Sequence, residues 1–208
     1  NGVIMEINAA PGIRMHHYPT EVKGRDVGEA ILKLQYNGFP HNIPVVSITG
    51  TNGKTTTTRL ISHVLKSMGY TVGMTSTEGT YIDGECIQTG DNSGYYSAKT
   101  VLLNKNVEVA VLETARGGII RNGLAYDLAD VAVITNITED HIGIDGIEDM
   151  NELSKVKALV GEAVKKDGYV IINADDEWSI KILDRIKNEK IFFSMNNENE
   201  LIKKAINE

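Results

Sequence analysis

From residue 44 onward, short apolar runs alternate with longer segments whose apolar residues recur at the spacing of a helix. The runs at 45–48, 107–112 and 131–134 are nearly continuous in apolar residues, which is typical of strands buried on both faces of a parallel sheet. Further strands are expected at 70–74, 169–172 and 191–194, helices at 96–104, 148–166 and 177–186, and a hairpin at 81–87. This alternation predicts an α/β protein with a doubly wound, mainly parallel sheet, which binds ligands at the carboxyl ends of its strands.

The first part of the chain differs in composition from the rest. It predicts a short strand at 3–8, a turn at Pro11-Gly12 and an irregular segment after the turn. The spacing of apolar residues predicts a helix over 26–36, and the Gly and Pro residues of 37–44 predict a linker. The chain is therefore expected to comprise residues 1–25, 26–43 and 44–208, of which the last part is the α/β domain.

The composition of the 208 residues is that of a globular protein, with 41% hydrophobic and 24% charged residues. The net charge of -7 argues against a nucleic-acid partner, because nucleic-acid binders usually carry a basic surplus. A single cysteine, Cys86, excludes a disulfide within one chain. Neither a membrane span nor a signal peptide is recognisable. We therefore expect a cytoplasmic protein without a membrane partner, and the sequence leaves open whether it forms a homo-oligomer.

The strongest chemical signal is a glycine-rich loop between the strand at 45–48 and the helix that Gly69 is expected to end. Its residues are Gly50, Thr51, Asn52, Gly53, Lys54, Thr55 and Thr56. Glycines let backbone amides turn toward phosphate oxygens, and the positive end of the helix dipole adds to the attraction. Lys54 can reach the β- and γ-phosphates of ATP, and the Thr55 hydroxyl can bind Mg²⁺. Ile48 stands where the strict pattern has Gly, and the alternative interpretation is an ordinary glycine-rich turn before a helix.

Two further side chains follow expected central strands. Glu113 ends the strand at 107–112, and His141 comes after the strand at 131–134. The carboxyl ends of parallel strands meet at one edge of a sheet, so both side chains are expected near the phosphate loop. A carboxylate and an imidazole placed there can hold magnesium against the phosphates of ATP. Taken singly, Glu113 is explained better by a capping or salt-bridge role, and His141 by an ordinary loop position, so the interpretation as a site depends on their combination with the phosphate loop.

The phosphate loop resembles that of the Mur ligase superfamily, which includes peptidoglycan ligases, folylpolyglutamate synthetases and cyanophycin synthetases. The resemblance implies the Mur ligase central-domain fold, with Glu113 and His141 as magnesium ligands. It also implies a lysine on the next helix whose amine is carbamylated by CO₂ and supports a second magnesium ion. Lys157 is our choice for that residue, and Lys155 is the alternative, because residues two apart face different sides of a helix. Lys54, His141 and Lys157 are accordingly the expected catalytic residues.

The segment at 173–176 follows another expected strand and reads Asn-Ala-Asp-Asp. It resembles a segment of the same family whose asparagine contacts adenine, which implies that role for Asn173. The alternative is a strand-to-helix turn in which Asp176 caps the next helix. The two interpretations are compatible.

Near the N-terminus, Glu6 and Asn8 are separated by one residue, so in a strand their oxygens face the same side and can share Mg²⁺. An ordinary edge strand is the alternative. The segment at 6–12 resembles the end of an ATP-grasp domain. An ATP-grasp domain followed by a Mur ligase domain is the arrangement of the cyanophycin synthetase family. The segments 113–118 and 140–146 also look more like that family than like the peptidoglycan ligases.

This resemblance implies an ATP- and Mg²⁺-dependent amide ligase of cyanophycin synthesis. The Mur half joins arginine to the β-carboxylate of aspartate, and the ATP-grasp half adds aspartate, so the expected partners are ATP, arginine, aspartate and an aspartate–arginine polymer primer. Most of the ATP-grasp domain and the family's C-terminal ligase domain are not recognisable, so we expect an inactive fragment. The alternatives are another Mur-superfamily ligase of the peptidoglycan or folylpolyglutamate type, a P-loop ATPase, and a non-catalytic nucleotide-binding module.

Overall fold

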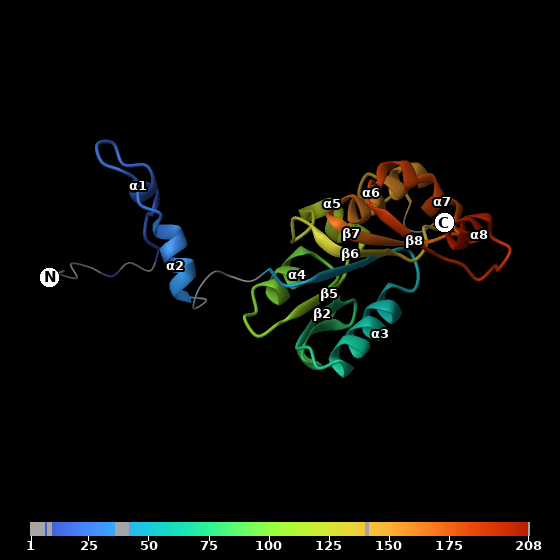
Figure 1. The fold of residues 1–208 in the computed structure, drawn as a ribbon, viewed down its shortest axis with the longest axis horizontal. Helices are drawn as coiled ribbons and strands as arrows, with labels where there is room; N and C mark the ends of the chain where they lie inside the picture. Colours follow the sequence, from blue (N-terminus) through green and yellow to red (C-terminus); the bar gives the residue numbers. More distant parts are fainter. Residues whose placement is uncertain (1–6, 8–9, 36–41, 140–141, 208) are drawn as a thin grey trace. The chain divides into compact units, whose positions relative to one another are not determined.

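The computed structural model describes residues 7, 10–35, 42–139 and 142–207, and its chain divides into two compact units, Asn1–Asn42 and Ile43–Glu208 (Figure 1). The first unit contains α1 (Arg14–His17) and α2 (Val27–Gln35). Helix α2 confirms the helix expected there, whereas α1 replaces an expected irregular segment. The strand expected at 3–8, apart from residue 7, and residues 37–41 of the expected linker lie outside the described residues.

The second unit is built around an eight-stranded sheet with the order β4–β3–β2–β5–β1–β6–β7–β8. Its strands are β1 (Val45–Thr49), β2 (Val72–Ser76), β3 (Gly79–Ile82), β4 (Glu85–Thr89), β5 (Val109–Glu113), β6 (Ala129–Ile134), β7 (Val164–Asn173) and β8 (Glu189–Phe193). The pairings of β3 with β2 and with β4 are antiparallel, and the other pairings are parallel. The predictions of a mainly parallel α/β sheet and of a hairpin at 81–87 are therefore confirmed, whereas the antiparallel pairing of β2 with β3 was not predicted.

Helices cover both faces of this sheet, as a doubly wound fold requires. They are α3 (Lys54–Ser67), α4 (Tyr95–Leu102), α5 (Arg116–Asn122), α6 (Met150–Glu162), α7 (Glu177–Lys181) and α8 (Glu200–Asn207), with a 3₁₀ turn at Leu183–Arg185. Figure 1 shows α3 below the sheet and α5 to α7 above it. Successive residues of β5 point to opposite faces, so Val111 packs in the cluster beneath α3 and Leu112 in the cluster beneath α4.

Two expected helices of the second unit differ clearly from the observed elements, and helices α5 and α8 of this unit were not predicted. The helix expected to reach residue 166 ends at Glu162, because the chain from Val164 onward pairs with β6 as part of β7. The helix expected at 177–186 is divided into α7 and the 3₁₀ turn. Helix α5 contains two adjacent glycines, which have low helix propensity, and α8 was missed as well.

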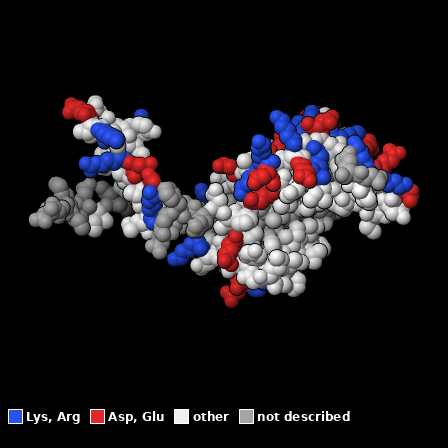
Figure 2. Space-filling model, viewed as in Figure 1, with Lys and Arg blue, Asp and Glu red and all other residues white. Residues whose placement is uncertain are grey.

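Charged side chains of both signs are interspersed on the face of the Ile43–Glu208 unit that Figure 2 shows, and they form no continuous basic stripe there. This distribution agrees with the acidic net charge. In the described part of the chain, no helix has both the length and the apolar character needed to cross a membrane.

The two helices that follow β6 and β7 begin at aspartate caps. Asp149 accepts a hydrogen bond from the backbone N–H of Glu152 (2.8 Å), and the Glu152 carboxylate accepts one from the N–H of Glu148 (2.7 Å). Asp176 accepts bonds from the N–H groups of Ser179 (2.7 Å) and Ile137 (3.0 Å). The predicted capping role of Asp176 is therefore confirmed, and this carboxylate also ties α7 to the chain after β6.

Replacing Asp149 by alanine should lower the free energy of unfolding by about 1 kcal/mol, because the first turn of α6 loses its side-chain acceptor. Asp149→Asn is the matched control, since asparagine caps helices as well as aspartate does. Urea unfolding followed by circular dichroism measures both variants. Equal stability of Asp149→Ala and the wild-type protein would contradict the assigned cap.

Candidate active site

The phosphate loop and Glu113 lie at the carboxyl edge of the central strands. Strand β1 lies between β5 and β6, and its register pairs Ile48 with Glu113 on one side and Thr49 with Ile134 on the other. The loop leaves β1 at this edge, and Glu113 is the last residue of β5. The parallel pairing therefore brings the two groups together.

Two glycines give the phosphate loop its shape. Gly50 has a φ of +146°, and a Cβ at this position would lie 1.9 Å from Oγ1 of Thr135. Gly53 has a φ of +82° and precedes the first residue of α3 without a side chain that could cap the helix. The N–H groups of the first turn of α3 are thus left uncapped by Gly53, which suits them to bind phosphate oxygens.

The chain after β6 holds the loop in place. The Asn136 side chain accepts from the N–H of Asn52 (2.9 Å) and donates to its carbonyl (3.0 Å). The Thr51 hydroxyl bonds both the carbonyl and the N–H of Thr138 (3.0 Å each). Lys54 donates from Nζ to the Thr51 carbonyl (3.0 Å), so its ammonium group folds over the loop itself.

Glu113 is a buried carboxylate at the foot of this loop, with 2% of its surface exposed. Its Oε2 accepts hydrogen bonds from the Thr55 hydroxyl (2.8 Å) and the Thr77 N–H (3.3 Å). Its Oε1 is buried and has no hydrogen-bond partner among the described residues. A buried carboxylate oxygen of this kind is costly unless it is paired, so Glu113 and the Thr55 hydroxyl fit a magnesium ion, which prefers oxygen ligands.

The other predicted metal ligands, Glu6, Asn8 and His141, lie outside the described residues. Across the part of the chain that the structure describes, no three His, Cys, Asp or Glu side chains gather closely enough to form a metal site on their own.

The two candidate lysines on α6 differ in their surroundings. Lys157 is buried, with 3% of its surface exposed, and lines a cleft that Lys54 and Gly50 also line. Lys155 is exposed to solvent. The position of Lys157 fits a role in the site, and that of Lys155 fits an ordinary surface lysine.

Asn173 ends β7 and is held by two hydrogen bonds. Its Nδ2 donates to the carbonyl of Thr135 (3.0 Å), and its Oδ1 accepts from the N–H of Asp175 (2.9 Å). A side-chain amide has a second donor hydrogen and a second acceptor lone pair, so Asn173 retains the capacity to bind a nucleotide base. It is not among the residues that line the cleft of Lys54 and Lys157.

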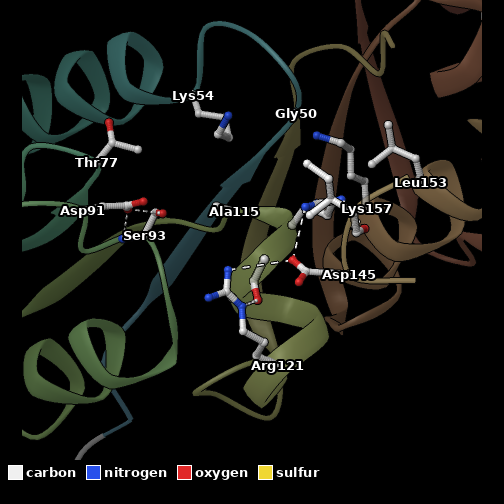
Figure 3. A pocket seen from close by; sticks show the side chains of 14 residues that line it. Gly50, Lys54, Thr77, Asp91, Ser93, Ala115, Arg121, Asp145, Leu153 and Lys157 are labelled. Atoms are coloured by element: carbon white, nitrogen blue, oxygen red, sulfur yellow. Dashed lines mark hydrogen bonds and ion pairs between the residues drawn. The ribbon is translucent and has the colours of Figure 1, made fainter. Parts of the chain in front are cut away.

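The cleft has a volume of about 510 Å³ and opens beside the phosphate loop (Figure 3). Six polar residues that line it were not predicted as site residues, namely Thr77, Asp91, Ser93, Arg116, Arg121 and Asp145. Arg116 and Asp145 belong to the two segments, 113–118 and 140–146, that resemble the cyanophycin synthetases, and this resemblance was the sequence signal available for them. The other four residues carried no such signal.

Near Glu113, the partly buried Tyr126 links β1 to the residue that follows β5. Tyr126 donates from its hydroxyl to Oγ of Ser47 on β1 (2.7 Å), and Ser47 is bonded to the Thr114 hydroxyl (2.8 Å). Burial raises the pKa of Tyr126 to about 12. The tyrosine therefore stays neutral at physiological pH and adds no charge near the Glu113 carboxylate.

Comparison with known proteins gives three concordant results. Residues 48–208 match the family described as the Mur ligase middle domain. The chain is 47% identical over 207 residues to a cyanophycin synthetase from Synechocystis sp., a match that covers 99% of this chain and 24% of that protein. The chain thus spans about a quarter of the length of this curated relative.

Two solved structures share the fold. One is a UDP-N-acetylmuramoyl-L-alanyl-D-glutamate–2,6-diaminopimelate ligase, with 20% identity, a TM-score of 0.62 and coverage of 83% of this chain and 36% of that chain. The other is E. coli FolC in complex with DHPP and ADP, with 18% identity, a TM-score of 0.51 and coverage of 86% and 49%.

The expected resemblance to the cyanophycin synthetases and the expected fold type are confirmed by these matches. The family match includes the phosphate loop, Glu113 and Lys157, and it reaches the end of the chain. On this evidence, the chain belongs to the Mur ligase middle domain family.

Proposed function

We propose that this chain is the ATP-binding part of a ligase that joins arginine to the β-carboxylate of an aspartate polymer. The proposal depends on one observation: Lys54 of the phosphate loop and the buried Lys157 line the same cleft, and the buried carboxylate of Glu113 bonds Thr55 of that loop. The 47% identity to a cyanophycin synthetase supports this choice of substrate over that of a peptidoglycan ligase. The complex of FolC with ADP supports an adenine nucleotide as the phosphate-loop ligand.

The proposed reaction forms an amide through an activated carboxylate. A carboxylate oxygen of the acceptor attacks the γ-phosphorus of ATP, and ADP leaves. The amine then attacks the carbonyl carbon of the acyl phosphate and a C–N bond forms. The bond from carbon to the phosphate oxygen breaks, inorganic phosphate departs, and the amine nitrogen loses a proton. Phosphorylation is needed because an unactivated carboxylate has no adequate leaving group at neutral pH.

The residues of the loop bind and orient the triphosphate. The uncapped N–H groups of α3 face the phosphates, and Lys54 exchanges its bond to the Thr51 carbonyl for the β- and γ-phosphate oxygens. In that position the Lys54 ammonium stabilises the negative charge that shifts as the γ-phosphoryl group moves. Asn136 keeps the loop from moving away, since it bonds both backbone groups of Asn52.

Thr55 and Glu113 are the proposed holders of magnesium, and His141 joins them by family resemblance. Bound magnesium supplies Lewis-acid stabilisation of the phosphoryl oxygens. Lys157 is the proposed carbamate: its neutral amine adds to CO₂, a C–N bond forms and a proton is released. The resulting anion faces the cleft from α6 and provides oxygens for a second magnesium ion.

Two further assignments rest on the family resemblance. Asn173 binds adenine with the donor and acceptor capacity that remains after its two backbone bonds. Residues 1–25 are the tail of an ATP-grasp domain, with Glu6 and Asn8 as its magnesium ligands, and residues 26–43 connect that tail to the domain at 44–208.

Lys54→Ala should weaken ATP binding by about 10- to 100-fold, because a charge-assisted bond to phosphate contributes about 1.5–3 kcal/mol. Calorimetry with MgATP measures the dissociation constant. Lys181→Ala is the control, since Lys181 is a partly exposed lysine on α7 that pairs with Glu177. Equal ATP affinity of Lys54→Ala and wild type would contradict the phosphate-loop assignment.

Lys157→Ala should lower turnover by about 100-fold while changing ATP affinity little, because the carbamate acts on the charge of the transferring group. Lys155→Ala on the exposed side of the same helix is the matched control, and its turnover should stay near that of the wild type. Phosphate release and nucleotide calorimetry separate the two effects. An equal loss of turnover in Lys157→Ala and Lys155→Ala would contradict the assignment of the carbamate to Lys157.

The substrate assignment is tested by ligation with the polypeptide that carries this chain. With primer, aspartate, arginine and ATP, we expect arginine to be incorporated and one ADP and one phosphate to be formed for each amide. Incorporation of a different amino acid into a muramyl or folyl acceptor would retain the ligase and reject this substrate. ATP hydrolysis without any ligated product would reject the ligase itself.

A further inference from the structure

Helix α5 forms one wall of the cleft, and its two glycines shape that wall. A Cβ at Gly117 would lie 2.4 Å from Nη2 of Arg121, one turn further along the helix. A Cβ at Gly118 would lie 2.9 Å from the Cα of Gly94. Gly117 thus leaves room for the Arg121 guanidinium, and Gly118 lets α5 approach the loop that carries Asp91 and Ser93.

The two arginines of α5 are held differently. Arg116 has 12% of its side chain exposed and donates to the Ile144 carbonyl (3.0 Å) and to Asp145 (3.3 Å). These bonds fasten the loop after β6 to the start of α5. Arg116 therefore has a structural task that occupies its guanidinium.

Arg121 presents its guanidinium to the cleft. Its Nε donates to the Gly117 carbonyl (3.0 Å), which fixes the direction of the side chain, and 68% of the side chain is exposed. Among the described residues, Nη2 of Arg121 lies 4.0 Å from Oδ2 of Asp145. Figure 3 shows Arg121 and Asp145 across the cleft from Lys54. Its terminal N–H groups are well placed to bind a planar carboxylate.

A carboxylate, that of Asp91, lines the cleft opposite α5 (Figure 3). Asp91 accepts bonds from the N–H (3.2 Å) and the hydroxyl (2.6 Å) of Ser93 through the same oxygen, Oδ1. Lysine, arginine and aspartate side chains all line the cleft, so it offers both signs of charge, which suits an acceptor with both charges.

An acceptor that ends in aspartate poses a problem of choice, and this step rests on the proposed function. Its last residue has two carboxylates, the α-carboxylate of the main chain and the β-carboxylate of the side chain. Only one of them is to receive the γ-phosphoryl group at Lys54. The carboxylate that does not react needs a binding group on the far side of the cleft.

We propose that Arg121 binds the non-reacting α-carboxylate of the acceptor's terminal aspartate and so directs the β-carboxylate toward Lys54. Arg121 determines specificity and takes no part in bond making. Gly117 is a positioning residue, because its carbonyl accepts the bond from Arg121 Nε and its lack of a Cβ leaves room for the guanidinium.

The test compares two peptide acceptors in a ligation assay with the polypeptide that carries this chain. One peptide ends in aspartic acid, and the other has the same sequence with an α-carboxamide, so both retain the β-carboxylate. We expect the KM of the wild-type protein to be about tenfold lower for the free acid than for the carboxamide, which is the effect of one charge-assisted contact. The KM ratio, defined as the KM for the carboxamide divided by the KM for the free acid, is then about ten. In Arg121→Gln this ratio should fall to about one.

Gly117→Ala provides a second test with the arginine retained. Alanine favours helix, so the variant should fold at least as well as the wild-type protein, as thermal unfolding will show. Its KM ratio should nevertheless fall toward one, because the new methyl group displaces the guanidinium. Arg185→Gln, which alters a surface arginine paired with Glu162 and absent from the cleft lining, should retain the tenfold ratio.

A wild-type KM ratio near one, or an unchanged ratio in Arg121→Gln, overturns the role of Arg121 while ligation of both peptides upholds the ligase proposal. Failure of the ligase proposal has a different signature: neither peptide consumes ATP with formation of an amide. A KM ratio lost in Arg185→Gln as well would show a general effect of charge and would also overturn the assignment.

Discussion

The close approach between the phosphate loop and the end of β6 is the constraint on which the site depends. At Gly50 there is no room for a Cβ, since it would lie 1.9 Å from the Thr135 hydroxyl oxygen. This contact lets Asn136 reach both backbone groups of Asn52, so the loop is fixed before any nucleotide arrives. A preformed loop loses little conformational entropy when it binds phosphate. The position of Lys54 follows from the same contact, because Lys54 opens the helix to which the loop leads.

Around this loop the protein keeps a carboxylate in its interior. Burial of Glu113 is costly in isolation, and the Thr55 hydroxyl and Thr77 N–H satisfy one of its two oxygens. The second oxygen is buried and has no hydrogen-bond partner among the described residues. An unpaired buried carboxylate oxygen destabilises the folded domain, and it is the observation on which the proposed magnesium site depends.

The residues that line the cleft lie outside the strands of the shared fold. The fold itself is shared with a diaminopimelate ligase and with FolC. The lining residues come from the connecting segments, including α5 and the loop of Asp91. These segments vary without disturbing the sheet, because they lie outside its hydrogen-bonded ladders. Gly117 and Gly118 have low helix propensity, and the absence of a Cβ at each leaves space that neighbouring atoms occupy.

The sequence alone determined the parallel sheet, the hairpin at Asp83-Gly84, the phosphate loop and the family, because each depends on residue order over a short stretch. Tertiary structure decided what depends on distant partners: the early start of β7 at its pairing with β6, the glycine-rich helix α5, and the burial of Lys157 in contrast to the exposure of Lys155. It also assembled Asp91 and Arg121 in one cleft. Periodicity records which side of an element is apolar, whereas only packing fixes which polar side chains from separate elements share a space.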